Sequence, residues 1–424
     1  MAPHRKRRGV LTAVATLCAL ALTACSTGTP SSNGSSGGDS SGSGTVTVWH
    51  YFTDKKQISM LDQFKKMFED SHPGTTVDNV YVPYDQINQK AVNAATSKTG
   101  PDIISMNGAE AATLILGGAL APLDDRLGAW KDKAQLPEST LHVLDGKTYA
   151  LQGYVNLLAL WYNEDMLNEL GLKPPTTIDE MESAMAAAKA KGHSGITLTG
   201  LPNSQSEWQS HPWLTGEGFT YDNLDEAALT KVLTRVHKWA QEGWLSPEAT
   251  TWDQTVPFQV WAAGDTLFAE NGNWRMGTAK SDAKFKYGVT TLPVGSKGRV
   301  YLGGEAQGVG AFSKNPDLAW EYLTSTYLSP EGELAAAKTV GSLPARLDTA
   351  SDSSIASDPL LVPFAQSVAK LGDPYPSSSI PPTAVNDVFV AMGQAWSSAI
   401  SGQTSPEDAA ATALATVKEA IGKK

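Results

Sequence analysis

The sequence predicts an α/β fold divided into two lobes, and three observations support this class. Residues 45–106 alternate strand, helix, strand, helix and strand, which is the order of a parallel sheet with crossover helices. The chain has 424 residues, 41% of them hydrophobic, which suggests two lobes rather than one. Its two cysteines, Cys18 and Cys25, lie near the start, so the rest of the chain relies on its hydrophobic core and not on disulfides.

The first residues predict export. Residues 1–24 form a basic segment and a short apolar run, which is typical of a signal peptide and too short for a membrane span. Cys25 follows a small residue and resembles the bacterial lipobox, in which the cysteine becomes the lipid-modified first residue of the mature protein. Ordinary cleavage nearby and a chance cysteine are the alternatives. Residues 25–44 are thus interpreted as a lipidated Cys25 and a disordered Ser/Gly linker.

The charge of the chain restricts its partners. The formal net charge is −11, and removal of the basic signal makes it more negative. An acidic surface argues against nucleic acids and polyanionic ligands, and it is compatible with a neutral solute.

The first region predicts a sheet with a ligand-binding edge. Strands are expected at residues 45–51, 77–84 and 102–106, with helices from Asp54 and Asp85 between them. Ligands bind beyond the carboxyl ends of strands in such sheets. The side chains at those ends are polar or aromatic, although each has a structural alternative such as a core aromatic or a solvated helix residue: His50, Tyr51, Tyr84, Asn107 and Glu110.

The middle of the chain predicts further strands and helices. Residues 146–163 are strand-like, helices are expected at 163–171, 177–191 and 225–241, and a strand at 196–199. Residues 201–219 are interpreted as a loop that holds Trp208, His211 and Trp213.

Residues 251–277 predict a short helix, a strand at 266–269 and a turn over Asn271-Gly272-Asn273-Trp274. An aromatic ring beside two amides suits a flat polar ligand, and a structural turn with a core tryptophan is the alternative.

The last part of the chain is mostly helical. A strand is expected at 287–292, and Gly303-Gly304 precedes Glu305, where paired glycines indicate close backbone approach or a β-bulge. Helices are expected at 316–328, 330–340, 359–371, 383–400 and 406–421.

Taken in order, these motifs resemble the extracellular solute-binding proteins of ABC importers, in particular the carbohydrate-type group. The resemblance runs from residue 45 to 421 and rests on the lipobox and on residues 100–104, 118–124, 160–163, 271–274, 288–293, 303–304 and 341–346. It implies two lobes, each a mainly parallel sheet flanked by helices, joined by a multi-strand hinge. The chain would cross near 153–154, 279–285 and 328–331, which assigns 45–153 and 284–328 to lobe 1 and 154–283 and 329–424 to lobe 2. It also implies that solute binds between the lobes, closes the hinge and passes to the importer's membrane subunits.

The resemblance also places ligand contacts. Asn156 stands where a relative has a carboxylate, and Glu305 where many relatives have tryptophan. Sugar rings need aromatic faces for their C–H surfaces and polar side chains for their hydroxyl rims. The complete set of expected ligand-binding residues is His50, Tyr51, Tyr84, Asn107, Glu110, Tyr154, Asn156, Trp208, Trp213, Trp252, Asp253, Asn271, Asn273, Trp274, Gly304, Glu305, Arg346 and Tyr375.

Three functions remain open from the sequence. The first is a monomeric, lipid-anchored receptor that binds a sugar or oligosaccharide, with no cofactor and no enzymatic activity. The second keeps the fold but binds a polyol phosphate or a polyamine. The third is an anchored glycoside hydrolase that uses carboxylates such as Glu110, Asp253 and Glu305, although the sequence places no acid pair. The histidines are scattered without ligand spacing, so no metal site is expected.

Overall fold

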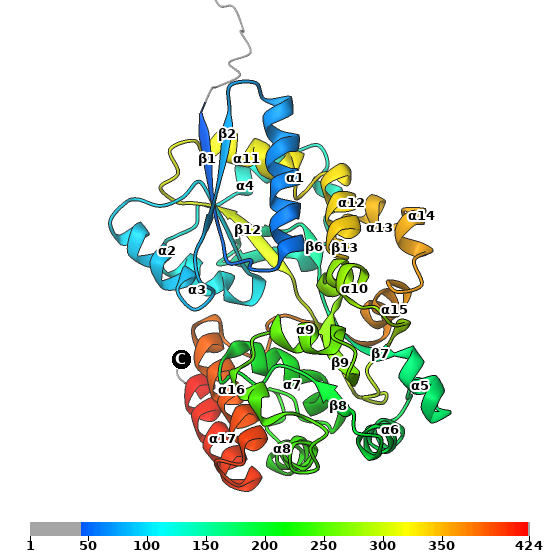
Figure 1. The fold of residues 1–424 in the computed structure, drawn as a ribbon. Coiled ribbons are helices and arrows are strands. Elements are labelled where there is room, and N and C mark those ends of the chain that lie inside the picture. The colour runs from blue at the N-terminus through cyan, green and yellow to red at the C-terminus, as the bar shows by residue number, and fades with distance from the viewer. Residues whose placement is uncertain (1–43, 423–424) are drawn as a thin grey trace, which may run out of the picture. The chain divides into compact units, whose positions relative to one another are not determined.

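The structure, a computed structural model, describes residues 44–422 except for the side chain of Ala369. The expected signal peptide and Cys25 lie outside these residues. Within them, two separate β-sheets are each covered by helices, which confirms the α/β class and the two lobes (Figure 1).

The first sheet has six strands in the order β2-β1-β3-β12-β5-β4. Strands β2, β1 and β3 are parallel, whereas the pairings of β12 and β5 are antiparallel. The expectation of a mainly parallel sheet was therefore wrong: β12 enters from the second lobe, and a tight Asp145-Gly146 turn with positive φ at both residues joins β4 to β5. The strands are β1 (Thr45–His50), β2 (Thr76–Tyr81), β3 (Ile103–Asn107), β4 (Leu141–Leu144), β5 (Lys147–Gln152) and β12 (Glu305–Val309).

The second sheet has four strands in the order β10-β7-β9-β8, and only β8 and β9 are parallel. Every residue of β9 is buried, including the polar Thr266, Glu270 and Asn271. The strands are β7 (Leu158–Asn163), β8 (Ser194–Thr197), β9 (Thr266–Gly272) and β10 (Tyr287–Thr290).

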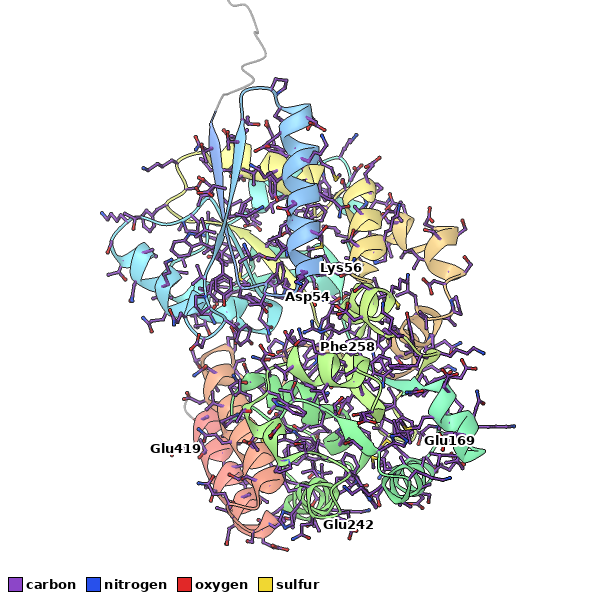
Figure 2. The ribbon with its side chains drawn as sticks, in the orientation of Figure 1. Asp54, Lys56, Glu169, Glu242, Phe258 and Glu419 are labelled. Atoms are coloured by element: carbon purple, nitrogen blue, oxygen red, sulfur yellow. The ribbon has the colours of Figure 1, made fainter. Side chains whose placement is uncertain are left out.

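Helices around the first sheet bury an apolar stripe. In α1, Asp54 caps the first turn by accepting a hydrogen bond from the backbone N–H of Lys56 at 2.7 Å, and Phe64 and Phe68 are fully buried. Figure 2 shows Asp54 and Lys56 at the start of this helix. The helices of this lobe are α1 (Lys55–Ser71), α2 (Ile87–Thr96), α3 (Ala111–Leu116), α4 (Asp124–Ala129), α11 (Pro316–Ser325) and α12 (Pro330–Thr339).

Helices around the second sheet include several that the sequence predicts closely. Thr177 and Glu180 form the expected capping box of α6. The other helices of this lobe are α5 (Glu164–Leu170), α6 (Ile178–Ala190), α7 (Ser204–Gly216), α8 (Glu226–Gln241), α9 (Val256–Ala262), α10 (Met276–Asp282), α14 (Ser353–Ala356), α15 (Val362–Leu371), α16 (Val385–Ser401) and α17 (Pro406–Gly422). Helix α13 (Leu347–Ala350) instead contacts α12 of the first lobe.

Helix α7 replaces the loop that we expected at residues 201–219. Asn203 caps it, and Pro212 lies inside it. Its side chains from Ser206 to Thr215 are all buried, so the helix has no amphipathic stripe to reveal it.

The segments between the lobes lie beside one another. Strand β6 (Tyr154–Val155) pairs with β13 (Leu343–Pro344), and the backbones of Asn156 and Gly303 exchange hydrogen bonds of 2.8 and 2.9 Å. The chain therefore changes lobe near residues 153–157 and 303–304. It changes lobe again only beyond Arg346, which still donates to the carbonyl of Leu328 in the first lobe.

Two expected lobe boundaries differ from this arrangement. Residues 284–290 were expected in lobe 1, but β10 pairs with β7 in the second sheet. Residues 329–340 were expected in lobe 2, but Ala336 and Val340 are buried in the same core as Phe64 of α1. Hydrophobic burial of α12 against α1 thus keeps this segment with the first sheet.

Candidate functional site

A cavity of about 530 Å³ lies between the two sheets and is lined from both. Ten of the expected ligand-binding residues line it: Tyr51, Tyr84, Asn107, Asn156, Trp208, Asp253, Trp274, Gly304, Glu305 and Tyr375. Its size and mixture of aromatic and polar side chains are typical of small-molecule sites.

The first sheet supplies one wall because of its strand directions. Strands β1, β2 and β3 are parallel, so their carboxyl ends meet at one edge. Asn107 is the last residue of β3, and Tyr51 and Tyr84 follow β1 and β2. Strand β12 runs the opposite way and starts at that edge, with Glu305 in register with Asn107. Antiparallel pairing thereby adds a carboxyl group to the row of strand ends.

Glu305 is held by hydrogen bonds from both sides. Tyr51 donates its hydroxyl to Oε1 at 3.2 Å, and the amide of Asn156 donates to Oε2 at 3.3 Å. Burial raises the pKa of Glu305, while the hydroxyl donors oppose this rise.

Aromatic rings form the facing part of the lining. Trp208 of α7 packs edge-on against Tyr375 with centroids 4.5 Å apart, and it lies 6.3 Å from the Trp274 ring. Two glycines make room for these rings: a Cβ on Gly272 would lie 1.8 Å from the Trp274 ring, and one on Gly303 would lie 2.3 Å from Trp208. The turn expected over residues 271–274 therefore starts later: β9 continues to Gly272, and the 3-10 helix Asn273–Arg275 that follows it presents Trp274 at the cavity.

A hydrogen-bond network around Tyr84 connects the two lobes. The Tyr84 hydroxyl lies 3.1 Å from the carboxyl group of Glu110, from the amide of Asn107 and from the hydroxyl of Ser204 in the second lobe. The other Glu110 oxygen accepts from Asn88. Burial raises the pKa of Glu110. Glu110 lines a neighbouring cavity of about 500 Å³ and not the first one.

The side-chain amides of Asn271, in β9, and of Asn273, directly after β9, support the lining from behind. Asn273 Oδ1 accepts from the backbone N–H of Leu157 at 2.9 Å, and its amide donates to Val155, Asn156 and Gly341 at 3.0–3.1 Å. Asn271 donates to the carbonyl of Gln254 at 3.0 Å. Asn273 thus connects the hinge segments to the end of β9, and neither asparagine is among the residues that line the cavity.

Four further expected residues are buried away from the cavity. Trp213 donates its indole N–H to Glu270 at 2.8 Å, and Trp252 packs in the core of the second lobe. Tyr154 is buried in the first-lobe core. Arg346 binds both carboxylate oxygens of Asp348 at 2.9 and 2.7 Å, which uses its guanidinium.

His50 also lies behind the lining. It is 3% exposed, and its Nδ1 accepts from the backbone N–H of Phe52 at 3.3 Å. Burial lowers the pKa of His50 to about 4. The neutral imidazole therefore supports the loop after β1.

Several lining residues were missed by sequence reasoning. Five are direct neighbours of expected residues. Those at 201–205 lie at or just before the unrecognised start of α7, for which Asn203 as a helix cap was the available signal. The missed residues are Phe52, Thr53, Gln57, Tyr81, Pro83, Asp85, Leu201, Pro202, Asn203, Gln205, Gln254, Thr255 and Arg275.

Arg275 is the most informative of these. Its guanidinium donates to Asp54, the cap of α1, at 2.9 Å and to the Thr255 hydroxyl at 2.9 Å. Arg275 and Asp54 are 3% and 7% exposed, so this is a buried ion pair between α1 and the segment after β9.

Within residues 44–422, no three His, Cys, Asp or Glu side chains gather to hold a metal ion. Over the same residues, no helix has the length and apolarity needed to cross a bilayer.

Comparison with known proteins supports both the fold and the class. The chain is 24% identical over 436 residues to the galactooligosaccharide-binding protein of Bacillus subtilis (strain 168), which covers 96% of each chain. It is 23% identical to the maltotriose-binding protein of Pyrococcus abyssi, over 77% of this chain and 72% of that one. The GacH receptor of Streptomyces glaucescens, solved unliganded and with acarbose, has the same fold, with a TM-score of 0.79, 24% identity and coverage of 90% of this chain and 99% of that chain.

The family model described as bacterial extracellular solute-binding protein matches residues 60–363, which is well over half of the sequence. That match agrees with two lobes and a lined cavity between their sheets. The chain belongs to the bacterial extracellular solute-binding proteins.

Proposed function

We propose that the cavity binds a sugar or an oligosaccharide and that the protein delivers it to an ABC importer. The observation that carries this proposal is the convergence of three aromatic rings, Trp208, Trp274 and Tyr375, with carboxyl and amide groups on one cavity of about 530 Å³. The relatives named above bind galactooligosaccharide and maltotriose, which supports a carbohydrate ligand.

The chemistry of the lining fits the two surfaces of a sugar. Trp208 and Trp274 offer flat apolar area for the C–H face of a ring. Glu305, Asn156 and Asp253 offer acceptors and donors that fix hydroxyl groups in direction. The side chains are already held by Tyr51, by Asn273 and by backbone N–H groups, so little ordering is needed when ligand binds.

A thermal-shift and calorimetric screen tests this function. The panel holds mono- and oligosaccharides with glucose and galactose units, together with spermidine and glycerol 3-phosphate. A ligand at about 100 times its Kd raises the unfolding free energy by about 2.7 kcal/mol. We expect a saccharide to raise Tm. If only spermidine or glycerol 3-phosphate raised Tm, the carbohydrate proposal would be wrong and the ligand would be another polar solute.

We also propose that the protein is a binding protein without catalytic activity. Retaining and inverting glycosidases need two carboxyl groups at defined separations, with distinct pKa values. After incubation with the purified protein, chromatography should show that the same glycosides are intact. Product formation at a rate that depends on Glu305 would contradict the proposal that the protein is a receptor without catalytic activity.

We propose that Cys25 carries a lipid that attaches the protein to the outer face of the cell membrane. Two or more acyl chains are needed for stable attachment. Cys25→Ser should move the protein from the membrane fraction into the medium, as followed by immunoblotting. Retention of this variant at the membrane would eliminate the anchor.

A further inference from the structure

A buried histidine on α7 contacts two segments that are far apart in the sequence. His211 is 4% exposed, its Nε2 lies 3.1 Å from Oδ2 of Asp373, and its ring is stacked on Tyr301 with centroids 3.5 Å apart and planes 13° apart. Burial lowers the pKa of His211, although Asp373 opposes this. A neutral ring must carry its proton on Nε2 to donate to the carboxylate.

The two residues that His211 contacts lie opposite each other in a small sheet. Strand β11 (Val300–Leu302) pairs in parallel with β14 (Gly372–Pro374), and Tyr301 is in register with Asp373. The Tyr301 hydroxyl is also fixed, because it donates to Glu207 at 2.9 Å. His211 therefore fastens both strands of this sheet to α7.

Both strands lead directly to the cavity. Tyr375 follows β14, and its ring packs on Tyr301 at 4.8 Å and on Trp208 at 4.5 Å. Gly303 follows β11, and a Cβ there would lie 3.2 Å from the Tyr375 ring. The Tyr375 hydroxyl accepts from Asn107 of the first lobe at 3.4 Å. A small movement of β14 would consequently displace a ring that lines the cavity and touches both lobes.

Backbone pairing alone provides little rigidity here, because β14 has three residues and includes Pro374, which lacks a backbone N–H. Burying an imidazole against a carboxylate is costly unless the two groups are paired in good geometry. The pair thus supplies a directional link where the short sheet supplies few hydrogen bonds.

We infer that His211 and Asp373 are positioning residues for ligand binding, which hold Tyr375 at the cavity through their mutual hydrogen bond. This inference rests on the proposed function for its effect on affinity, but its structural part is independent of the ligand.

The variants separate the hydrogen bond from simple packing. His211→Phe keeps a ring on Tyr301 and removes the donor, whereas His211→Gln keeps a donor. His237→Phe is the matched control, since His237 is a half-buried histidine of the same lobe whose Nδ1 lies 2.8 Å from the carbonyl of Ala399, away from the cavity lining.

Affinity is measured by calorimetry with maltotriose and with galactooligosaccharide as probes. We expect His211→Phe to weaken the wild-type Kd about tenfold, the size of one lost charge-assisted hydrogen bond. His211→Gln should restore most of the affinity, and His237→Phe should leave it unchanged. Equal affinity of His211→Phe and wild type would overturn the inference.

A double-mutant cycle with Tyr375→Ala distinguishes positioning from a general structural role. If His211 acts through Tyr375, His211→Phe has no further effect on affinity once Tyr375 is removed. A structural role would reduce stability in both backgrounds without this coupling, so additive losses of affinity would contradict the inference.

Hydrogen exchange of the ligand-free protein provides the third measurement. The amides of Gly372, Asp373 and Tyr375 should exchange faster in His211→Phe than in wild type, and at the wild-type rate in His237→Phe. If neither probe binds to wild-type protein, the carbohydrate proposal fails, and exchange still decides whether His211 fixes Tyr375. Unchanged exchange at these three amides would overturn the inference.

Discussion

At the scale of single residues, Trp274 is the side chain whose role depends most directly on the ligand. Its ring lines the cavity above Gly272 and is 7% exposed. Trp274→Ala should weaken saccharide binding at least about tenfold because the stacking surface is lost. Calorimetry measures the loss. Trp130→Ala removes a half-buried ring that does not line the cavity and should keep wild-type affinity; unchanged binding by Trp274→Ala would remove it from the site.

A second residue-scale prediction concerns Glu207, which is fully buried beneath the aromatic rings. Its Oε1 accepts from Tyr221 at 2.7 Å and from Tyr301 at 2.9 Å, and burial raises its pKa from 4.5 to about 8. The folded protein thus holds this proton between about pH 4.5 and pH 8, where the unfolded chain has released it. The stability that this proton supplies is full below pH 4.5 and is lost as the pH rises to about 8.

Glu207→Gln should remove this pH dependence, because the amide stays neutral and its oxygen can still accept from both tyrosines. The slope of the unfolding free energy between pH 5 and 8 should become less negative by up to about 1.4 kcal/mol per pH unit. Chemical denaturation across this range measures it. Glu242→Gln, at an exposed site labelled in Figure 2, is the control. Equal slopes for wild type and Glu207→Gln would show that Glu207 is ionised in the folded state.

At the scale of elements, the passage from β11 to β12 depends on the absence of a side chain at Gly303. A Cβ there would lie 2.3 Å from the Trp208 ring and 3.2 Å from Tyr375. Gly303→Ala should push these rings out of place and weaken saccharide affinity about tenfold or more, because it moves the lining of the cavity. Calorimetry and near-ultraviolet circular dichroism check both effects.

Gly128→Ala is the matched control for this substitution. Gly128 lies in α4, and nothing lies within 4 Å of a Cβ built on it. This variant should retain wild-type affinity and gain slightly in stability, since alanine favours a helix. Wild-type binding by Gly303→Ala would show that the rings can shift without loss.

At the scale of the whole molecule, three chain segments connect the lobes, near residues 153–157, near 303–304 and beyond Arg346. A ligand that contacts both lobes binds the closed form better than the open form and shifts the population toward it. Small-angle X-ray scattering should therefore show a smaller radius of gyration when saccharide saturates the protein. Trp274→Ala at the same ligand concentration should show less change. An unchanged radius at saturation would contradict hinge closure.

The sequence predicted some elements correctly and others wrongly, and the difference has a physical cause. Local signals worked well where they sit within one element: Asp54 caps α1, and Thr177 with Glu180 caps α6. They failed for α7, where burial on all sides removes the periodic pattern. They also failed for the lobe boundaries, since β10 and α12 are assigned by their partners β7 and α1.

The candidate site shows the same division. Tyr51, Tyr84 and Asn107 could be predicted as site residues from their positions at strand ends, because the carboxyl ends of parallel strands meet at one edge of the sheet. Asn273, Arg346 and His50 have suitable chemistry, but their hydrogen-bonding groups are used within the protein. Residue type alone does not reveal that these hydrogen-bonding groups already have partners, because the partners come from distant parts of the chain.

The sequence by itself determined the α/β class, most strands and helices, and a set of aromatic and amide residues suited to a polar solute. These features depend on local periodicity, helix caps and turn residues. Only the tertiary structure decided which side chains meet at the cavity, where the chain changes lobe, and that His211 is linked to Tyr375 through Asp373. The reason is that side-chain direction and hydrogen-bond partnership are set by packing between segments that can be more than 200 residues apart, as Asp54 and Arg275 are.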